Sequence, residues 1–267
     1  MNILTNKLND DDDVDDDDVD DDDDNGDNDE HHDCGIGAAT VKSLLKADLQ
    51  VVGLARRVDR MEQLRSSLAN SLQSRLHIIK CDVSDMMSVN EAFDWIEEHL
   101  DGVDILINNA GVHIKGQLLT MNINDVEKTL QTNVMGMVYC ARRAFNSMKK
   151  RNVNGHLVLI NSILGHNLPN LGPSITPFVN IYPMSKHATV AMTEVLRQEF
   201  RENQTKIKIT SISPGLVNTE MTTELCKTMS ALEPEDVSMA VLYCLSTPAH
   251  VQILVVTGRT SRYNGFT

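Results

Sequence analysis

Tyr182 and Lys186 stand four residues apart in the stretch YPMSK, and this pairing of residue types could do acid–base chemistry. Residues four apart share one face of a helix, and Pro183 suits the first turn of a helix, where its missing N–H costs nothing. An ammonium beside a phenol lowers the pKa of the phenol from about 10 toward neutrality, which makes Tyr182 a usable general acid or base. A tyrosine and a lysine on an ordinary surface helix explain a lone pair equally well, so other motifs have to decide.

A second motif is the Gly-x-Gly of Gly35, Ile36 and Gly37, which is typical of the turn that binds dinucleotide phosphates. An ordinary turn explains two glycines equally well. About 20 residues after a phosphate-binding turn, an acid binds a ribose hydroxyl or an arginine binds a 2′-phosphate. Arg56 and Arg57 stand at that distance, so the sequence favours NADP(H) as the cofactor.

These side chains must be positioned by regular elements, and from Gly35 onward apolar runs of strand length alternate with segments of helix length. The alternation predicts βα units, and the near-continuous apolar character of the strands predicts helices on both faces of the sheet. We therefore expect an α/β fold with a single Rossmann-like, doubly wound parallel sheet. Strands are expected at 49–55, 76–81, 103–109, 156–161, 207–213 and 251–256, and helices near 38–47, 59–72, 85–99, 123–150, 182–201 and 235–246.

The charge is unevenly distributed along the chain. The formal net charge is -14, from 38 acidic and 24 basic residues, but residues 1–33 hold 17 of the acidic residues and a single lysine. A segment with so much charge of one sign and so little apolar area cannot form a core. We expect residues 1–33 to be a disordered, acidic, low-complexity tail and residues 34–267 to form the folded domain.

The first strand of the predicted sheet raises a difficulty. A doubly wound nucleotide-binding domain begins with a central strand that leads directly into the glycine turn. Residues 22–29 read DDDNGDND, which cannot be a core strand, so the sequence predicts that the first strand is missing. The run ILVVTG at 253–258 could replace it, but its place after TPAHVQI favours the edge strand.

In chain order, the motifs GIG, NNAG, NVMG, INSILG, YPMSK and SPGLVNTEM resemble those of the short-chain dehydrogenase/reductase family. The resemblance covers residues 35 to about 252. Around these motifs, the local sequence is similar to the branch of the family that contains insect farnesol dehydrogenases and NADP-dependent 17β-hydroxysteroid or carbonyl reductases. It implies that Ser162 binds the substrate oxygen, Tyr182 exchanges its proton, Lys186 holds the nicotinamide ribose and Asn133 keeps a chain of water molecules. The residues that it implies for cofactor binding are Gly35, Ile36, Gly37, Arg56, Arg57, Asp82, Val83, Asn109, Ala110, Gly111, Tyr182, Lys186, Pro214, Gly215, Val217 and Thr219.

The segment between Ser162 and Tyr182 contains proline, glycine and apolar side chains, which suggests a loop on the substrate side. We therefore predict an oxidoreductase that uses NADP(H) and no metal to interconvert an alcohol and a carbonyl on an apolar substrate, such as the isoprenoid alcohol farnesol or a steroid. The apolar side chains of this segment could instead pack against a dimer partner. They are Leu168, Leu171, Ile175 and Phe178. His113 and His166 receive no role, because a loop histidine is more often solvated or satisfied in the core.

The sequence departs from the family at the glycine turn. Glu30 and His31 stand where threonine and the first glycine are expected, and Asp33 stands where the phosphates pass. The first glycine permits the tight turn, and a carboxylate repels a pyrophosphate. The alternative function is a catalytically impaired relative without cofactor binding, whose acidic tail binds basic proteins or divalent cations. A solvating tail without a partner is the simpler interpretation of that segment.

Location and assembly follow from the remaining patterns. The five cysteines show neither paired nor metal-ligand spacing, and no apolar run approaches the roughly 20 residues of a membrane span. We expect a cytoplasmic protein with no membrane span and no nucleic-acid partner. The family resemblance implies a homodimer or homotetramer formed through the helices at 123–150 and 182–201, which carry Val134, Met137, Val138, Val190 and Val195 at helical spacing.

Overall fold

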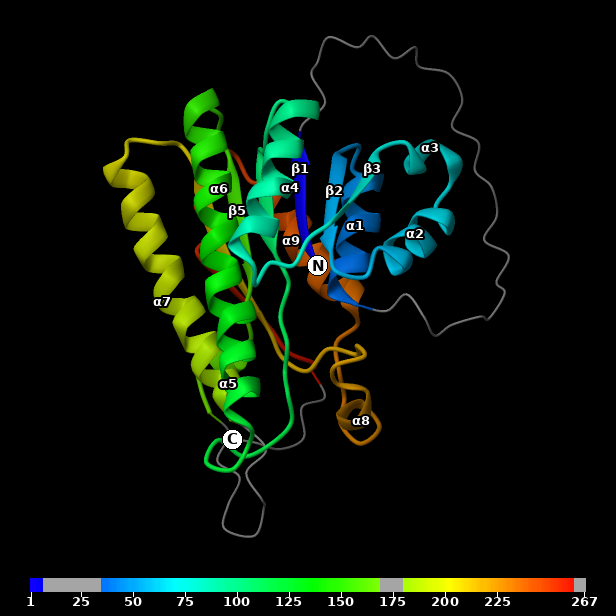
Figure 1. The fold of residues 1–267 in the computed structure, drawn as a ribbon, viewed down its shortest axis with the longest axis vertical. Coiled ribbons are helices and arrows are strands. Elements are labelled where there is room, and N and C mark those ends of the chain that lie inside the picture. The colour runs from blue at the N-terminus through cyan, green and yellow to red at the C-terminus, as the bar shows by residue number, and fades with distance from the viewer. Residues whose placement is uncertain (7–34, 169–179, 262–267) are drawn as a thin grey trace.

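The computed structural model of the protein describes residues 1–6, 35–168 and 180–261. A seven-stranded sheet passes through the middle of the molecule in the order β3-β2-β1-β4-β5-β6-β7 (Figure 1). Its strands are β1 (Asn2–Asn6), β2 (Gln50–Ala55), β3 (Leu76–Lys80), β4 (Ile105–Asn108), β5 (His156–Ile160), β6 (Lys208–Pro214) and β7 (Val255–Gly258). All pairings other than those of β1 are parallel. The predicted Rossmann-like, doubly wound sheet is confirmed, and β7 occupies the edge as expected.

The prediction that the first strand is missing is wrong. Residues 2–6 fill the central slot of the sheet, where β1 pairs antiparallel with both β2 and β4. Ile3 and Leu4 are 0% and 1% exposed, and they point into the hydrophobic cores on opposite faces of the sheet. The expectation assumed that the first strand must directly precede the glycine turn, where the aspartate run stands. An antiparallel strand does not lead into that turn, so it can lie earlier in the sequence.

The reversed strand also corrects the predicted tail. Residues 1–6 belong to the folded domain because their backbone and apolar side chains complete the sheet. The acidic residues 7–34 lie outside the described residues. Met1, which precedes β1, therefore lies at the carboxyl ends of the parallel strands, close to the start of α1 (Ile36–Lys46).

Helices cover both faces of the sheet, as the apolar strands predict. One core lies beneath α4 (Met86–His99), α6 (Gly136–Arg151) and α7 (Ile181–Glu202). The other lies beneath α1, α2 (Val58–Ser66) and α9 (Pro234–Ser246). The remaining helical elements are α3 (Asn70–Gln73), α5 (Ile123–Leu130), a π-helical turn (Gln131–Met135), a 3-10 turn (Ile163–Gly165) and α8 (Thr223–Cys226). In the described parts of the chain, every helix is too short or too polar to cross a membrane.

Side-chain caps fix where the functionally relevant helices begin. Asp85 accepts a hydrogen bond from Met87 N at 2.9 Å at the start of α4. At the start of α7, Asn180 Oδ1 accepts from Tyr182 N at 3.1 Å, and Asn180 Nδ2 donates to the carbonyl of Ile114 at 2.7 Å. Such caps satisfy N–H groups that have no partner within the helix. Asn180 thereby ties the first turn of α7 to the loop that follows β4.

The helices expected to meet a partner subunit differ in how their apolar residues are placed. Met137, one of the apolar residues on the helices expected at the partner interface, is 2% exposed and belongs to the core of its own subunit. The neighbouring Gly136 allows α6 to approach the loop after β3, where Val83 O lies 2.9 Å from the position of a Cβ built at Gly136. Val195 on α7 is exposed.

Candidate active site

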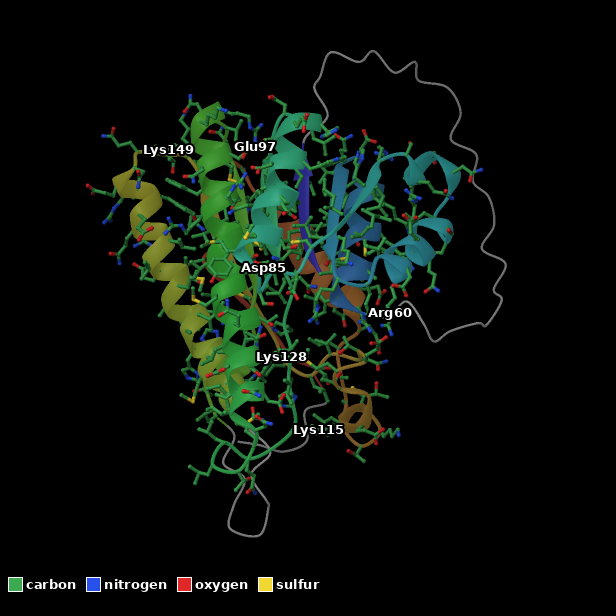
Figure 2. All side chains as sticks on the ribbon, in the orientation of Figure 1. Arg60, Asp85, Glu97, Lys115, Lys128 and Lys149 are labelled. Carbon is green, nitrogen blue, oxygen red and sulfur yellow. The ribbon has the colours of Figure 1, made fainter. Side chains whose placement is uncertain are left out.

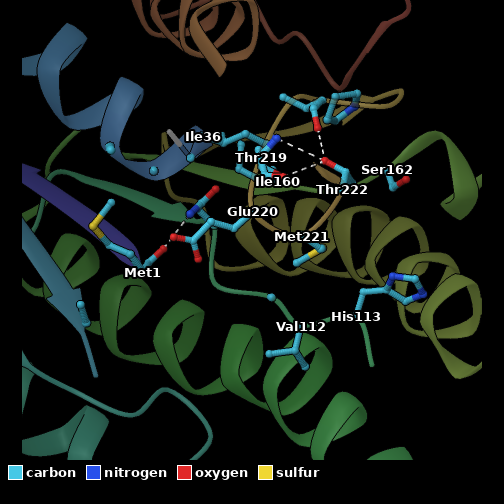
Figure 3. A pocket seen from close by; sticks show the side chains of 18 of the residues that line it. Met1, Ile36, Val112, His113, Ile160, Ser162, Thr219, Glu220, Met221 and Thr222 are labelled. Atoms are coloured by element: carbon cyan, nitrogen blue, oxygen red, sulfur yellow. Dashed lines mark hydrogen bonds between the residues drawn. The ribbon is translucent and has the colours of Figure 1, made fainter. Parts of the chain in front are cut away.

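A cavity of about 670 Å³ opens at the carboxyl ends of the parallel strands (Figure 3). This edge is where open α/β sheets bind ligands. Its walls are the start of α1, the residues that follow β2, β4, β5 and β6, and the first turn of α7.

Ser162, Tyr182 and Lys186 meet at one end of this cavity. Ser162 follows β5 in an extended conformation, and its Oγ accepts a hydrogen bond from Leu164 N at 3.1 Å. Tyr182 and Lys186 project from the first turns of α7, with Lys186 Nζ 5.6 Å from the centre of the Tyr182 ring. Lys186 Nζ donates to Ile160 O at 2.9 Å, which anchors the ammonium at the end of β5.

Burial dominates the acid–base properties of this group. It raises the pKa of Tyr182 to about 12, and a side-chain hydrogen bond between Ser162 and Tyr182 opposes that shift. Burial also lowers the pKa of Lys186 to about 8. The expectation that Lys186 lowers the pKa of Tyr182 toward neutrality is therefore wrong for the cofactor-free protein. The Lys186 ammonium is held by Ile160 O, and burial of the phenol is the largest cause of the raised pKa of Tyr182.

Asn133 lies beside this group without lining the cavity, and it is fully buried in the π-helical turn between α5 and α6. Its Nδ2 donates to Val112 O at 3.0 Å and to Ser185 Oγ at 3.1 Å, while its Oδ1 accepts from Val112 N at 2.8 Å. Single π-helical turns are frequent at functional sites. Here the turn brings Asn133 between the loop after β4 and the first turns of α7.

The start of α1 has the properties of an anion site. Gly35 is the N-cap residue, and among the described residues no side chain caps the helix and no atom lies within 4 Å of a Cβ built at Gly35. The first N–H groups of a helix lack intrahelical partners and favour phosphate. Gly37 is different, because a Cβ there would collide with Met1 Cε and lie 2.8 Å from Asn109 Nδ2. The open helix start fits a dinucleotide phosphate, whereas Gly37 is required for close packing.

The far end of the cavity is basic. Arg56 and Arg57 line it directly after β2, and Arg60 joins them from α2. Asp82 lies in an adjoining hollow that it shares with Arg56. Although burial opposes the shift, hydrogen bonds from Ser84 and the charge of Arg56 hold the pKa of Asp82 below its usual value.

Most of the residues predicted to bind the cofactor line the cavity. They are Gly35, Ile36, Gly37, Arg56, Arg57, Asn109, Gly111, Tyr182, Lys186, Pro214, Gly215, Val217 and Thr219. Val83 and Ala110 line neither the cavity nor the adjoining hollow. Val83 packs against Gly136, and the Ala110 N–H donates to the side chain of Asn2 at 2.8 Å.

The reversed strand contributes directly to the cavity wall. Asn2 is 1% exposed, and its Oδ1 accepts from the N–H groups of Asn109 at 2.9 Å and Ala110 at 2.8 Å. Its Nδ2 donates to Asn108 Oδ1 at 2.7 Å, and Asn109 Nδ2 donates to Met1 O at 3.0 Å. Residues 1 and 2 thus hold the segment after β4. The residues that depart from the family turn, Glu30, His31 and Asp33, lie outside the described residues.

Several lining residues received no role in the sequence analysis. Met1 enters because β1 is reversed, and Glu220 enters because the segment after β6 folds back over the arginines. His113 packs its ring against Tyr182 with the ring centres 5.0 Å apart, and burial and the charge of Lys115 lower the pKa of His113. The sequence offered a signal for Arg60, since it stands three residues after Arg57, the N-cap residue of α2.

The doubly wound sheet, with a serine, a tyrosine and a lysine at its carboxyl edge beside an open helix start, defines a nucleotide-binding α/β oxidoreductase. The family model described as short chain dehydrogenase matches residues 32–230, and the chain belongs to this family.

Relatives agree with this assignment. The chain is 48% identical over 226 residues to farnesol dehydrogenase of Aedes aegypti, covering 84% of this chain and 90% of the relative. It is 40% identical over 232 residues to dehydrogenase/reductase SDR family member 11 of Homo sapiens, covering 82% and 87%. Among solved structures, a closed form of serine dehydrogenase complexed with NADP+ matches with a TM-score of 0.72 and 27% identity, covering 84% of this chain and 90% of that chain.

Proposed function

We propose that the protein is an NADP(H)-dependent oxidoreductase that interconverts an alcohol and a carbonyl on an apolar substrate. The observation that carries the proposal is the meeting of Ser162, Tyr182 and Lys186 in one cavity with an open helix start and a group of arginines. The identity to a farnesol dehydrogenase supports an isoprenoid alcohol such as farnesol as the substrate, with a steroid as the next candidate.

The residues present fit the cofactor. In this proposal the N–H groups after Gly35 hold the pyrophosphate, Arg56 and Arg57 hold the 2′-phosphate, and Lys186 holds the nicotinamide ribose. The cofactor, when bound, supplies or accepts a hydride. Because guanidinium groups match phosphate bidentately and the cavity wall at Arg56 and Arg57 offers no carboxylate from β2, NADP(H) is preferred to NAD(H).

Side chains of the protein bind the substrate oxygen and supply its proton. Ser162 and the phenol of Tyr182 donate hydrogen bonds to the oxygen, where negative charge develops during carbonyl reduction. With a pKa of about 12, Tyr182 holds its proton at neutral pH and is ready to donate it. Lys186, with a pKa of about 8, carries a positive charge at the same pH and stabilises the phenolate that remains.

Apolar side chains support the proposed substrate class. Met221 lines the cavity and is 43% exposed, and the exposed Leu168 follows the turn that carries Ser162. The other apolar residues predicted for the substrate loop, Leu171, Ile175 and Phe178, lie outside the described residues.

The test is a pair of tyrosine variants assayed with NADPH and farnesal and, in the oxidative direction, with NADP+ and farnesol. Tyr182→Phe should abolish turnover while NADPH still binds and the Tm is unchanged, because only the exchangeable proton is removed. Tyr243→Phe, an exposed tyrosine on α9, is the matched control and should retain full activity. Turnover of Tyr182→Phe within a few-fold of the unmodified protein would refute the assignment.

A second candidate, the impaired relative without cofactor binding, is favoured by the position of Met1. Its side chain packs against Gly37, in the region where the family's turn approaches the phosphates. Titration of NADPH, followed by its fluorescence and by the Tm, separates the two candidates. Cofactor at about 100 times its Kd should stabilise the protein by about 2.7 kcal/mol, whereas the impaired relative would show no shift.

We further propose a cytoplasmic homodimer or homotetramer. The exposed apolar residues Leu130, Met135 and Val195 on the segment from α5 to α6 and on α7 support association through these helices. A reducing location is supported by the free thiols of Cys81, Cys140, Cys226 and Cys244.

A further inference from the structure

Glu220 is an acidic side chain inside a cavity end that otherwise gathers positive charge. Its Oε2 lies 3.8 Å from Arg57 NH2, and its Oε1 makes a short ion pair with Arg60 NH1. Figure 3 shows Glu220 within the cavity on the side of Met1, and Figure 2 shows Arg60 between α2 and the segment that carries α8. The carboxylate therefore occupies the place where an external anion would meet these two guanidinium groups.

Glu220 is held in this position by its own segment. Thr222 Oγ1 donates to Val217 O, and Thr219 N donates to Thr222 Oγ1 at 3.2 Å. The base of the segment is joined to Leu232, whose N–H donates to Leu216 O at 2.8 Å. These bonds fold residues 217–222 into a compact turn, so the carboxylate is presented to the arginines by a built structure.

The ion pairs conflict with the role that the proposed function gives to Arg57. A 2′-phosphate bound by the Arg57 guanidinium would come close to the Glu220 carboxylate, which contacts the same guanidinium. The two negative charges would repel each other. A dinucleotide without the 2′-phosphate has no such conflict, since its ribose hydroxyls are uncharged.

We propose that Glu220 is an internal competitor for the 2′-phosphate subsite: it neutralises Arg57 and Arg60 in the cofactor-free protein and must release them when NADP(H) binds. The inference rests on the proposed function. Thr219 and Met221 flank Glu220 and line the same cavity. Glu220 thereby sets the affinity for phosphorylated dinucleotides.

The test compares Glu220→Gln with Glu224→Gln. Glu224 is a matched control because it lies on the same segment, is similarly exposed and forms its own ion pair with Lys227 at 2.8 Å, outside the cavity. The Kd values of NADPH and NADH are measured by nucleotide fluorescence at low salt, and the Kd of 2′,5′-ADP is measured by calorimetry. Glu220→Gln should lower the Kd of NADPH and of 2′,5′-ADP by about two- to five-fold, the range that exposed ion pairs support.

The Kd of NADH should stay unchanged in Glu220→Gln, and Glu224→Gln should leave all three values unchanged. Added salt should shrink the effect, because exposed charges are screened. The inference is overturned if Glu220→Gln leaves NADPH affinity unchanged, weakens it, or strengthens NADH binding equally. Glu220→Ala must change NADPH affinity in the same direction as Glu220→Gln.

Failure of the inference can be separated from failure of the proposed function. An unmodified protein that binds NADPH, together with a Glu220→Gln variant of equal affinity, refutes the inference alone. If NADPH binds to neither protein, both are refuted. If it binds only to Glu220→Gln, the inference is supported and the unmodified protein is held in its inhibited form by this carboxylate.

Discussion

Lys186→Met should change the stability of the cofactor-free protein in a pH-dependent way. Lys186 is 4% exposed, and burial lowers its pKa to about 8 from an ordinary value of 10.5. The folded-state pKa is thus the lower one, so the unfolded chain binds more protons between these two values. Below pH 8 the folded protein bears the full cost of a buried charge, and this cost disappears as the pH rises toward 10.5. Methionine has a similar length and carries no charge.

The magnitude follows from the two pKa values. A shift of about 2.5 pKa units corresponds to about 3 kcal/mol at pH 7, falling to about 1 kcal/mol at pH 10. The substitution also removes the hydrogen bond to Ile160 O, which costs about 1–3 kcal/mol at either pH. Lys186→Met should therefore equal or exceed the unmodified protein in stability at pH 7 and fall below it at pH 10. The difference between the two free energies of unfolding should change by about 2.5 kcal/mol, while turnover is lost.

Urea unfolding between pH 7 and pH 10, followed by the fluorescence of the single tryptophan, Trp95, measures this difference. Taking the difference cancels the contributions of other groups, such as the thiol of Cys140, whose pKa burial raises to about 12. Lys46→Met, at the exposed end of α1, is the control and should parallel the unmodified protein. Parallel pH profiles for Lys186→Met and the unmodified protein would refute the reasoning that burial controls this ammonium.

Asn2→Leu should lower the free energy of unfolding by about 2–4 kcal/mol, because it leaves the buried N–H groups of Asn109 and Ala110 without their acceptor; urea unfolding measures the loss, and a change below about 1 kcal/mol would contradict the role of β1. His156 should make the protein acid-sensitive: burial lowers its folded-state pKa to about 3, so stability is present above pH 6.5 and is lost as the pH falls toward 3. In His156→Gln, the free energy of unfolding should fall by about 4 kcal/mol less between pH 6.5 and pH 3, and an unchanged pH profile would contradict the role of His156. Val195→Glu should convert a dimer into monomers in light scattering at micromolar concentration, and an unmodified protein that is already monomeric would refute the proposed association.

The fold was largely predictable because most of its strands carry their own signal. β5 is buried at every position, and a strand covered on both faces is expected to be a nearly continuous apolar run, as LVLI in β5 is. The spacing of Tyr182 and Lys186 likewise predicted a shared helix face, and both side chains do line one cavity. Such features can be predicted from the sequence because they depend on residues that are close together in the chain.

The features that were not predictable depend on contacts between distant segments. The direction of β1 is decided by its pairing with β2 and β4, and five residues carry no periodicity that could reveal it. The pKa of Tyr182 depends mainly on the burial of its phenol in the folded chain, which the sequence alone does not show. Glu220 reaches Arg57 and Arg60 across the cavity, from positions that are unrelated in the sequence.

The reversed β1 separates the order of elements along the chain from their direction in the sheet. In an ordinary βα unit the strand and the following helix meet at the same edge of the sheet and need only a short connection. Here Asn6 ends at the opposite edge from Gly35, the length of a strand, or about 17 Å, away. The order of strand and helix along the chain therefore does not by itself fix the direction in which the strand enters the sheet. A short segment at the start of the chain can complete an internal slot in either direction, provided that its apolar residues reach both cores, as Ile3 and Leu4 do.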